Sequence, residues 1–222
     1  HLLTHPLIRP ALREKDGSAY FLREVKGIVV HWTANTKHGA NAAANRSYFN
    51  QGFRPASAHY IVDSTAVLQC IPDNEVAFHC GDKPLGHYKP IGAAFIKATR
   101  LTPNYFTIGV ELCVNADGNW PVTYQSGVEL CARLLIKHGL NEANLHRHFD
   151  ITGKRCPAMF IEDKPWQTFL DLVGSMIRYL QSEYKTENGR VNTKNLNVRT
   201  GPGVSFPIRY ELFHGENITV YE

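Results

Sequence analysis

The stretch KGIVVHWT, residues 26–33, decides the fold of this chain. Its β-branched residues follow a glycine and end at His31, which predicts a buried strand. A second apolar stretch, FTIGVELCVN at 106–115, predicts another strand. The segment SAHYIVDSTAVLQCIP at 57–72 predicts two short strands joined by a turn at Asp63–Ser64. The other elements are predicted around these strands.

Helical segments alternate with the predicted strands. The alanine-rich segment at 39–53 predicts a helix closed by Gly52. Residues 124–138 predict a second helix, and a third is predicted to begin at Asp163, where apolar residues recur at helical spacing. Between them, residues 81–104 are rich in Gly, Pro and Lys and predict a long surface loop. The alternation of strands and helices predicts an α/β layer fold.

The character of the sequence changes after Ser182. Residues 1–182 are predicted to form one domain, and EYKTENGR at 183–190 reads as a polar linker. Residues 191–222 are rich in short β-type segments and turns and lack a helical period. They predict a separate small all-β unit.

Composition narrows the classes of function. The chain has 222 residues, 43% of them hydrophobic and 20% charged, which is typical of a globular protein. Its net charge of +4 comes without a basic block, so nucleic acid is not an expected partner. No apolar run approaches the roughly 20 residues that cross a bilayer, so no membrane span is expected. The first residues, HLLTHPLIRP, lack the pattern of a signal peptide.

The stretch LHRHFDITGKRCP at 145–157 concentrates reactive side chains. It could be a metal site, a nucleophile with its base, half of a disulfide or a polar loop. His148 and Cys156 are eight residues apart across Gly153, and such loop spacing lets both point at one ion. Zinc accepts histidine nitrogen and cysteine thiolate, with three protein ligands in catalytic sites. From these residues alone the alternatives stay open.

Cysteine usage favours free thiols. The five cysteines are an odd number at wide spacings, which argues against a disulfide framework. Cys70 and Cys80 could pair in an oxidising compartment.

Two residues outside that stretch add weight to a site. His31 ends a buried strand, where the residues of a sheet face a crevice. Glu111 lies within the apolar run TIGVELCV, where a carboxylate is costly unless it is paired or functional. It could be a general base with a raised pKa or a strand glutamate held in a salt bridge.

Four motifs then carry a resemblance to a known family. They are VVHWTAN at 29–35, SAHYIVDSTAVLQCIPDNEVAFHCG at 57–81, FTIGVEL at 106–112 and HFDITGKRCP at 148–157. In this order, over roughly residues 27–180, the chain resembles the zinc-dependent N-acetylmuramoyl-L-alanine amidases, which include peptidoglycan recognition proteins. The resemblance implies a central mixed β-sheet flanked by helices, with the catalytic domain in residues 1–182.

The resemblance also implies a set of site residues. His31, His148 and Cys156 match the zinc ligands, with His148 chosen because the family's spacing places a lysine at +6 and a ligand at +8. Glu111 matches the carboxylate that activates the attacking water. Lys154 matches the cation that stabilises the oxyanion.

Other matches concern substrate and the C-terminal part. His79 resembles a substrate-contacting wall residue, and Trp32 is also predicted to contact substrate. Ala58 stands where some members carry a catalytic tyrosine, which favours Glu111 as the base. LNVRTGPG at 196–203 resembles a bacterial SH3-like (SH3b) domain, so residues 191–222 imply a partial wall-binding module.

The implied function is zinc-dependent hydrolysis of the amide bond between N-acetylmuramic acid and L-alanine in peptidoglycan. A secreted or wall-associated autolysin, or a phage lysin released at host lysis, is expected. The alternatives are a non-catalytic recognition module, which typically lacks the third ligand, and a cytosolic enzyme of muropeptide recycling. A metal-free hydrolase using Cys156 and His148 would leave His31 and Lys154 unexplained.

Overall fold

The computed structural model describes residues 24–51, 56–81, 87–99, 101–182, 186–199 and 206–221. At its centre is a five-stranded sheet in the order β3-β2-β4-β1-β5. The strands are β1 (Gly27–Trp32), β2 (Tyr60–Val62), β3 (Val67–Gln69), β4 (Thr107–Leu112) and β5 (Leu145–Arg147). Four strands are parallel and β3 runs antiparallel to β2, which confirms the expected mixed sheet.

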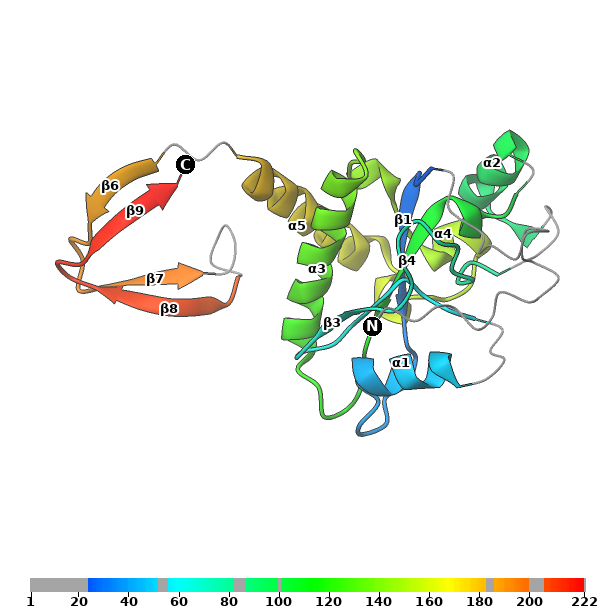
Figure 1. Ribbon diagram of the computed structural model, residues 1–222, viewed down its shortest axis with the longest axis horizontal. Coiled ribbons are helices and arrows are strands. Elements are labelled where there is room, and N and C mark those ends of the chain that lie inside the picture. Colours follow the sequence, from blue (N-terminus) through cyan, green and yellow to red (C-terminus); the bar gives the residue numbers. More distant parts are fainter. Residues whose placement is uncertain are drawn as a thin grey trace.

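Helices cover both faces of this sheet (Figure 1). They are α1 (Ala42–Asn50), α2 (Pro90–Thr99), α3 (Trp120–Lys137), α4 (His148–Thr152) and α5 (Asp163–Gln181). Three short 3-10 helices lie at Pro103–Tyr105, Glu142–Asn144 and Ala158–Phe160. Helices α3 and α5 pack on one face in the main hydrophobic core, and α2 and α4 pack on the other. The α/β layer prediction is confirmed.

Strand alternation separates the core from the site. In β1, Ile28 and Val30 join the core under α3 and α5, whereas Val29 packs with residues of α2 and α4. Successive side chains of a strand point to opposite faces, so His31 lies on the face of Val29. The parallel register pairs His31 with Glu111 of β4, which places both side chains on that face.

Most predicted elements are present, with two changes in the first 182 residues. The second helix begins at Trp120, four residues before the predicted start, because Asn119 caps it by accepting a hydrogen bond from the backbone N–H of Val122. The predicted loop at 81–104 contains α2. Its Pro and Gly residues suggested a loop, but Pro90 occupies the first helical position, where proline is tolerated. The expected closing residue Gly52 lies outside the described residues.

The C-terminal part contains two antiparallel strand pairs (Figure 1). Strand β6 (Thr186–Arg190) pairs with β9 (Asn217–Tyr221), and β7 (Asn195–Arg199) pairs with β8 (Ile208–Phe213). Most of the predicted linker at 183–190 is therefore a strand, because its backbone is paired with β9. Among the described residues, no helix is both long and apolar enough to cross a membrane.

Candidate metal and catalytic site

Three predicted ligands converge at the end of β1. One ring nitrogen each from His31 and His148 and the sulfur of Cys156 lie within 4.8 Å of one another, and all three residues are buried. The ring centroids of the two histidines are 4.7 Å apart, and Cys156 Sγ is 3.7 Å from His31 Nδ1. His31 comes from β1, His148 from the start of α4 and Cys156 from the loop that follows α4. Residues 125 positions apart in the chain therefore share one cluster.

The loop that carries two of these residues is held by a local network. Arg147 donates hydrogen bonds to the carboxylate of Asp150 through Nε at 3.0 Å and through Nη2 at 2.7 Å. Gly153 ends α4 in the left-handed region, with φ of 79°, which turns the chain back. The backbone N–H of Phe149 then donates to the carbonyl of Cys156 at 2.9 Å. Asp150 therefore shapes the loop.

The polar atoms of the cluster fit a metal ion. Among the described residues, Nδ1 of His148 is buried and has no hydrogen-bond partner. Burial is the main cause that lowers the pKa of His31 well below its ordinary value and that of His148 to about 4. Both rings are therefore neutral at pH 7, which is the form that binds metal. Two imidazoles and a cysteine sulfur match a zinc site with one open position.

The surroundings of Cys156 also indicate a metal ligand. Burial, with a contribution from the charge of Glu111, raises the pKa of its thiol to about 12. A thiol in such a place is a poor nucleophile at neutral pH, because only the thiolate attacks. A coordinated divalent ion would deprotonate it. The donor set thus fits a metal better than it fits a cysteine nucleophile.

Glu111 has the properties of a general base. It faces the cluster from the strand next to His31, and its Oε2 is buried without a hydrogen-bond partner among the described residues. Burial raises the pKa of Glu111 to about 8, partly opposed by the charge of Lys154. A carboxyl group with a pKa near neutrality is suited to accept and return a proton. The alternative of a salt-bridged strand glutamate is not what the structure shows, because its side chain has no ion pair among the described residues.

Lys154 supplies positive charge at the same site. Its side chain is exposed, and its carbonyl accepts from the backbone N–H of Cys156 at 2.7 Å, which fixes its place in the loop. Its charge is among the causes that lower the pKa of Glu111, His31 and His148. Lys154 therefore adds positive charge two residues before the ligand candidate Cys156.

The two residues predicted to contact substrate, His79 and Trp32, lie in different surroundings from each other. Only 7% of His79 is exposed, and its Nδ1 lies 2.9 Å from Nε2 of His31. The side chain of Trp32 points to the face opposite His31 by strand alternation. Its backbone N–H instead hydrogen-bonds to the thiol of Cys156. Substrate contact by these two residues stays a prediction.

Other histidines and cysteines have structural surroundings. The ring of His59 hydrogen-bonds to the Glu75 carbonyl at 2.9 Å and accepts from the Gly109 N–H at 3.0 Å, so both of its ring nitrogens are satisfied within the core. All five cysteines are buried and free, and Cys70 and Cys80 lie in different core clusters. They do not pair. The sequence did not predict that His31, His79 and Cys80 also form a tight group.

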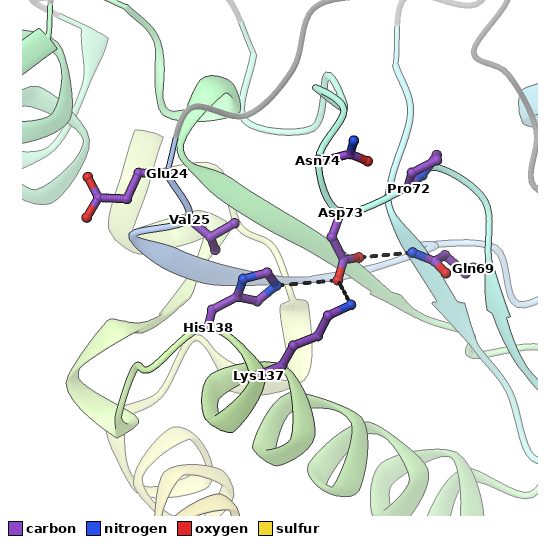
Figure 2. Close-up of a pocket in the computed structure, with 8 residues that line it drawn as sticks. All are labelled: Glu24, Val25, Gln69, Pro72, Asp73, Asn74, Lys137 and His138. Carbon is purple, nitrogen blue, oxygen red and sulfur yellow. Dashed lines mark hydrogen bonds and ion pairs between the residues drawn. The ribbon is translucent and has the colours of Figure 1, made fainter.

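A hollow lies away from this cluster, near the start of β1 and the end of α3 (Figure 2). It has a volume of about 510 Å³ and is surrounded by residues that precede β1, follow β3 and end α3. Asp73 accepts from Tyr60 at 2.6 Å, from Gln69 at 3.0 Å and from Lys137 at 2.6 Å, and lies 3.3 Å from His138. Because the carboxylate is satisfied within the protein, this network ties α3 to the sheet.

The sequence of this chain is similar to those of known amidases. Residues 21–159 match the family model described as N-acetylmuramoyl-L-alanine amidase. A probable N-acetylmuramoyl-L-alanine amidase of Bacillus licheniformis is 38% identical over 157 residues, and the amidase CwlL of the same species is 37% identical over 163. These matches cover 68% and 70% of this chain and 42% of each relative, so the chain spans about two fifths of their length.

Two solved structures agree at the level of the fold. The catalytic domain of XlyA is 30% identical with a TM-score of 0.57, covering 71% of this chain and 94% of that one. A mutant endolysin from Bacillus subtilis is 31% identical with a TM-score of 0.59, covering 70% and 89%. The family match spans more than half of the chain and includes His31, Glu111 and Cys156. The chain belongs to the N-acetylmuramoyl-L-alanine amidase family.

Proposed function

We propose that this protein hydrolyses the amide bond between N-acetylmuramic acid and L-alanine in peptidoglycan, with zinc held by His31, His148 and Cys156. The observation that carries the proposal is the convergence of these three side chains within 4.8 Å, beside a partly buried Glu111 in register with His31. A bound zinc ion would supply a Lewis acid that polarises a carbonyl and makes water more acidic.

The protein's own residues supply the proton transfers and charge stabilisation. Glu111 takes a proton from the attacking water as the water oxygen adds to the lactyl carbonyl carbon. The same carboxyl group returns that proton to the departing nitrogen of L-alanine, so that the amide bond breaks and an acid and an amine are left. The ammonium group of Lys154 stabilises the negative charge on the carbonyl oxygen.

The chemical products of digestion test the proposal. Purified peptidoglycan incubated with the protein is expected to release new L-alanine amino termini without new reducing sugar ends. New reducing ends with no new amino termini would identify a glycosidase and refute the proposal.

A matched pair of variants tests the roles within the site. Glu111→Gln is expected to keep one zinc per chain and to lose roughly 10²- to 10⁴-fold in turnover, the usual contribution of general base catalysis. Cys156→Ser is expected to lose metal and activity together. Full activity in Glu111→Gln would remove Glu111 as the base, and full activity in the metal-depleted parent would favour the metal-free alternative.

The place where the protein acts follows from the same proposal. Because peptidoglycan is outside the cytoplasm, the protein would act after secretion, at the wall, or as a phage lysin at host lysis.

Exposed Leu196, Ile208 and Phe213 on β7 and β8 support a wall-binding role for an SH3-like C-terminal part. Sedimentation with insoluble walls tests that role: Phe213→Ser in a Glu111→Gln background should bind more weakly, and equal binding would contradict it.

A further inference from the structure

His31 uses its two ring nitrogens in different directions. Its Nδ1 is 3.7 Å from Cys156 Sγ, whereas its Nε2 is 2.9 Å from Nδ1 of His79. A neutral imidazole carries one N–H donor and one nitrogen with a free lone pair. If Nδ1 of His31 is the nitrogen that meets the metal, Nε2 must carry the proton. His79 Nδ1 is then the acceptor of that proton's hydrogen bond.

The other side of the His79 ring is consistent with this assignment. With Nδ1 acting as an acceptor, Nε2 of His79 must be protonated. It faces two oxygens of Thr107, the side-chain Oγ1 at 3.3 Å and the carbonyl at 3.4 Å. The Thr107 hydroxyl donates to the carbonyl of Pro103 at 2.8 Å, so its lone pairs are free to accept from His79. The chain of hydrogen bonds therefore runs in one direction, away from His31.

The backbone around His79 is built to hold this ring. A Cβ at Gly109 would lie 2.6–2.9 Å from three atoms of the imidazole, so only glycine in β4 leaves space for it. Glycine inside a strand often marks such a close approach. The side chain of Asn104 accepts from the backbone N–H groups of His79 at 3.0 Å and Cys80 at 2.8 Å, which fixes the segment.

We propose that His79 is a positioning residue that holds the tautomer and orientation of His31, so that Nδ1 is presented to the metal. The proposal rests on the metal site proposed above. It replaces substrate contact as the role of His79, because both ring nitrogens already face protein atoms. Partners of this kind typically change metal affinity by 10- to 100-fold.

An alternative is that His79 is itself a ligand, since His31, His79 and Cys80 form a group of possible metal-binding atoms. Two nitrogens bound tetrahedrally to one zinc at about 2.0–2.1 Å would be roughly 3.3 Å apart. The observed 2.9 Å is instead the ordinary length of a hydrogen bond. Cys80, whose sulfur is 3.2 Å from His79 Nδ1, separates the two possibilities experimentally.

The test is zinc affinity, measured by competition with a chelator of known strength. His79→Leu should bind zinc 10- to 100-fold more weakly, whereas His79→Asn should stay within a few-fold of the parent, because its Oδ1 can take the place of Nδ1. A packing role predicts the reverse order, since leucine keeps the apolar volume. Cys80→Ala should match the parent; a large loss in that variant would favour the ligand alternative and overturn the proposal.

A third substitution at His79 keeps the test decisive if His79→Leu fails to fold. His79→Gln carries the same amide displaced by one methylene, so it should bind zinc at least about tenfold more weakly than His79→Asn. Equal affinity in these two variants, or parental affinity in His79→Leu, would refute the proposal. Absence of zinc binding by the parent protein would instead refute the metal site itself, and this inference with it.

Discussion

Replacing Glu111 by glutamine should make the metal-free protein increasingly stable, relative to the parent, as the pH rises. Burial raises the pKa of this carboxyl from its ordinary 4.5 to about 8 in the folded protein. The protonated form is therefore favoured by folding. Its contribution to stability is complete below pH 4.5 and is lost progressively as pH rises towards 8. Glutamine does not titrate, so Glu111→Gln avoids that loss.

The size of the effect follows from the shift. Each pH unit between the unfolded and folded pKa values changes the free energy of unfolding by about 1.4 kcal/mol. Between pH 4.5 and pH 7, the stability of the variant minus that of the parent should therefore increase by at most about 3 kcal/mol. This is an upper value because Glu111 is only partly enclosed and water screens some of its charge.

The assay is urea unfolding of parent and variant with a chelator present, at several values between pH 4.5 and pH 8. Any effect of the amide that does not depend on pH cancels. The test uses only how the difference in free energy of unfolding between parent and variant changes with pH. His31, His148 and Cys156 also titrate, but they are present in both proteins. A difference that stays constant across this range would show that Glu111 is not a buried carboxyl with a raised pKa.

Three further substitutions test the packing that holds the site. Gly92→Ala should cost about 1–3 kcal/mol, measured by urea unfolding, because its Cβ would lie 2.5 Å from the carbonyl oxygen of Ile151 in α4. Phe169→Ala should cost about 3–5 kcal/mol in the same assay, since that ring is fully buried in the main core. Asp73→Asn should cost about 1–3 kcal/mol at pH 7 through the weakened bond from Lys137. Burial acts to raise the pKa of Asp73, but its hydrogen bonds outweigh burial and lower it below 3.8, so this cost should disappear as the pH falls below that value.

Each of these has an outcome that would contradict it. A neutral Gly92→Ala would mean that α2 does not press on α4 as closely as the structure shows. A loss below 1 kcal/mol in Phe169→Ala would place that ring outside the core. A cost of Asp73→Asn that is the same at pH 3 and pH 7 would show that the charge of the carboxylate is not what matters.

The sequence predicted the sheet and its main helices because their signals are local. The apolar run at 26–33 and the helical spacing after Asp163 are each contained in one element. It missed α2 because glycine and proline usually interrupt helices, whereas Pro90 begins one and Gly92 lets it approach α4. It also read Thr186–Arg190 as a linker, because a polar stretch becomes a strand here only through its pairing with β9.

For the site, the sequence by itself determined which residues were candidates. Motif order singled out His31, His148, Cys156, Glu111 and Lys154. Only the tertiary structure decided that the three ligand candidates meet, because the parallel pairing of β1 with β4 and β5 brings distant segments to one edge of the sheet.

His79 shows most clearly the difference between what the sequence indicates and what the tertiary structure decides. The family resemblance implied a residue that contacts substrate. The structure instead directs its Nδ1 to His31 and buries the ring against Gly109. Which nitrogen of a histidine meets which partner depends on the orientation of rings that are 48 residues apart, and that is fixed by packing in three dimensions.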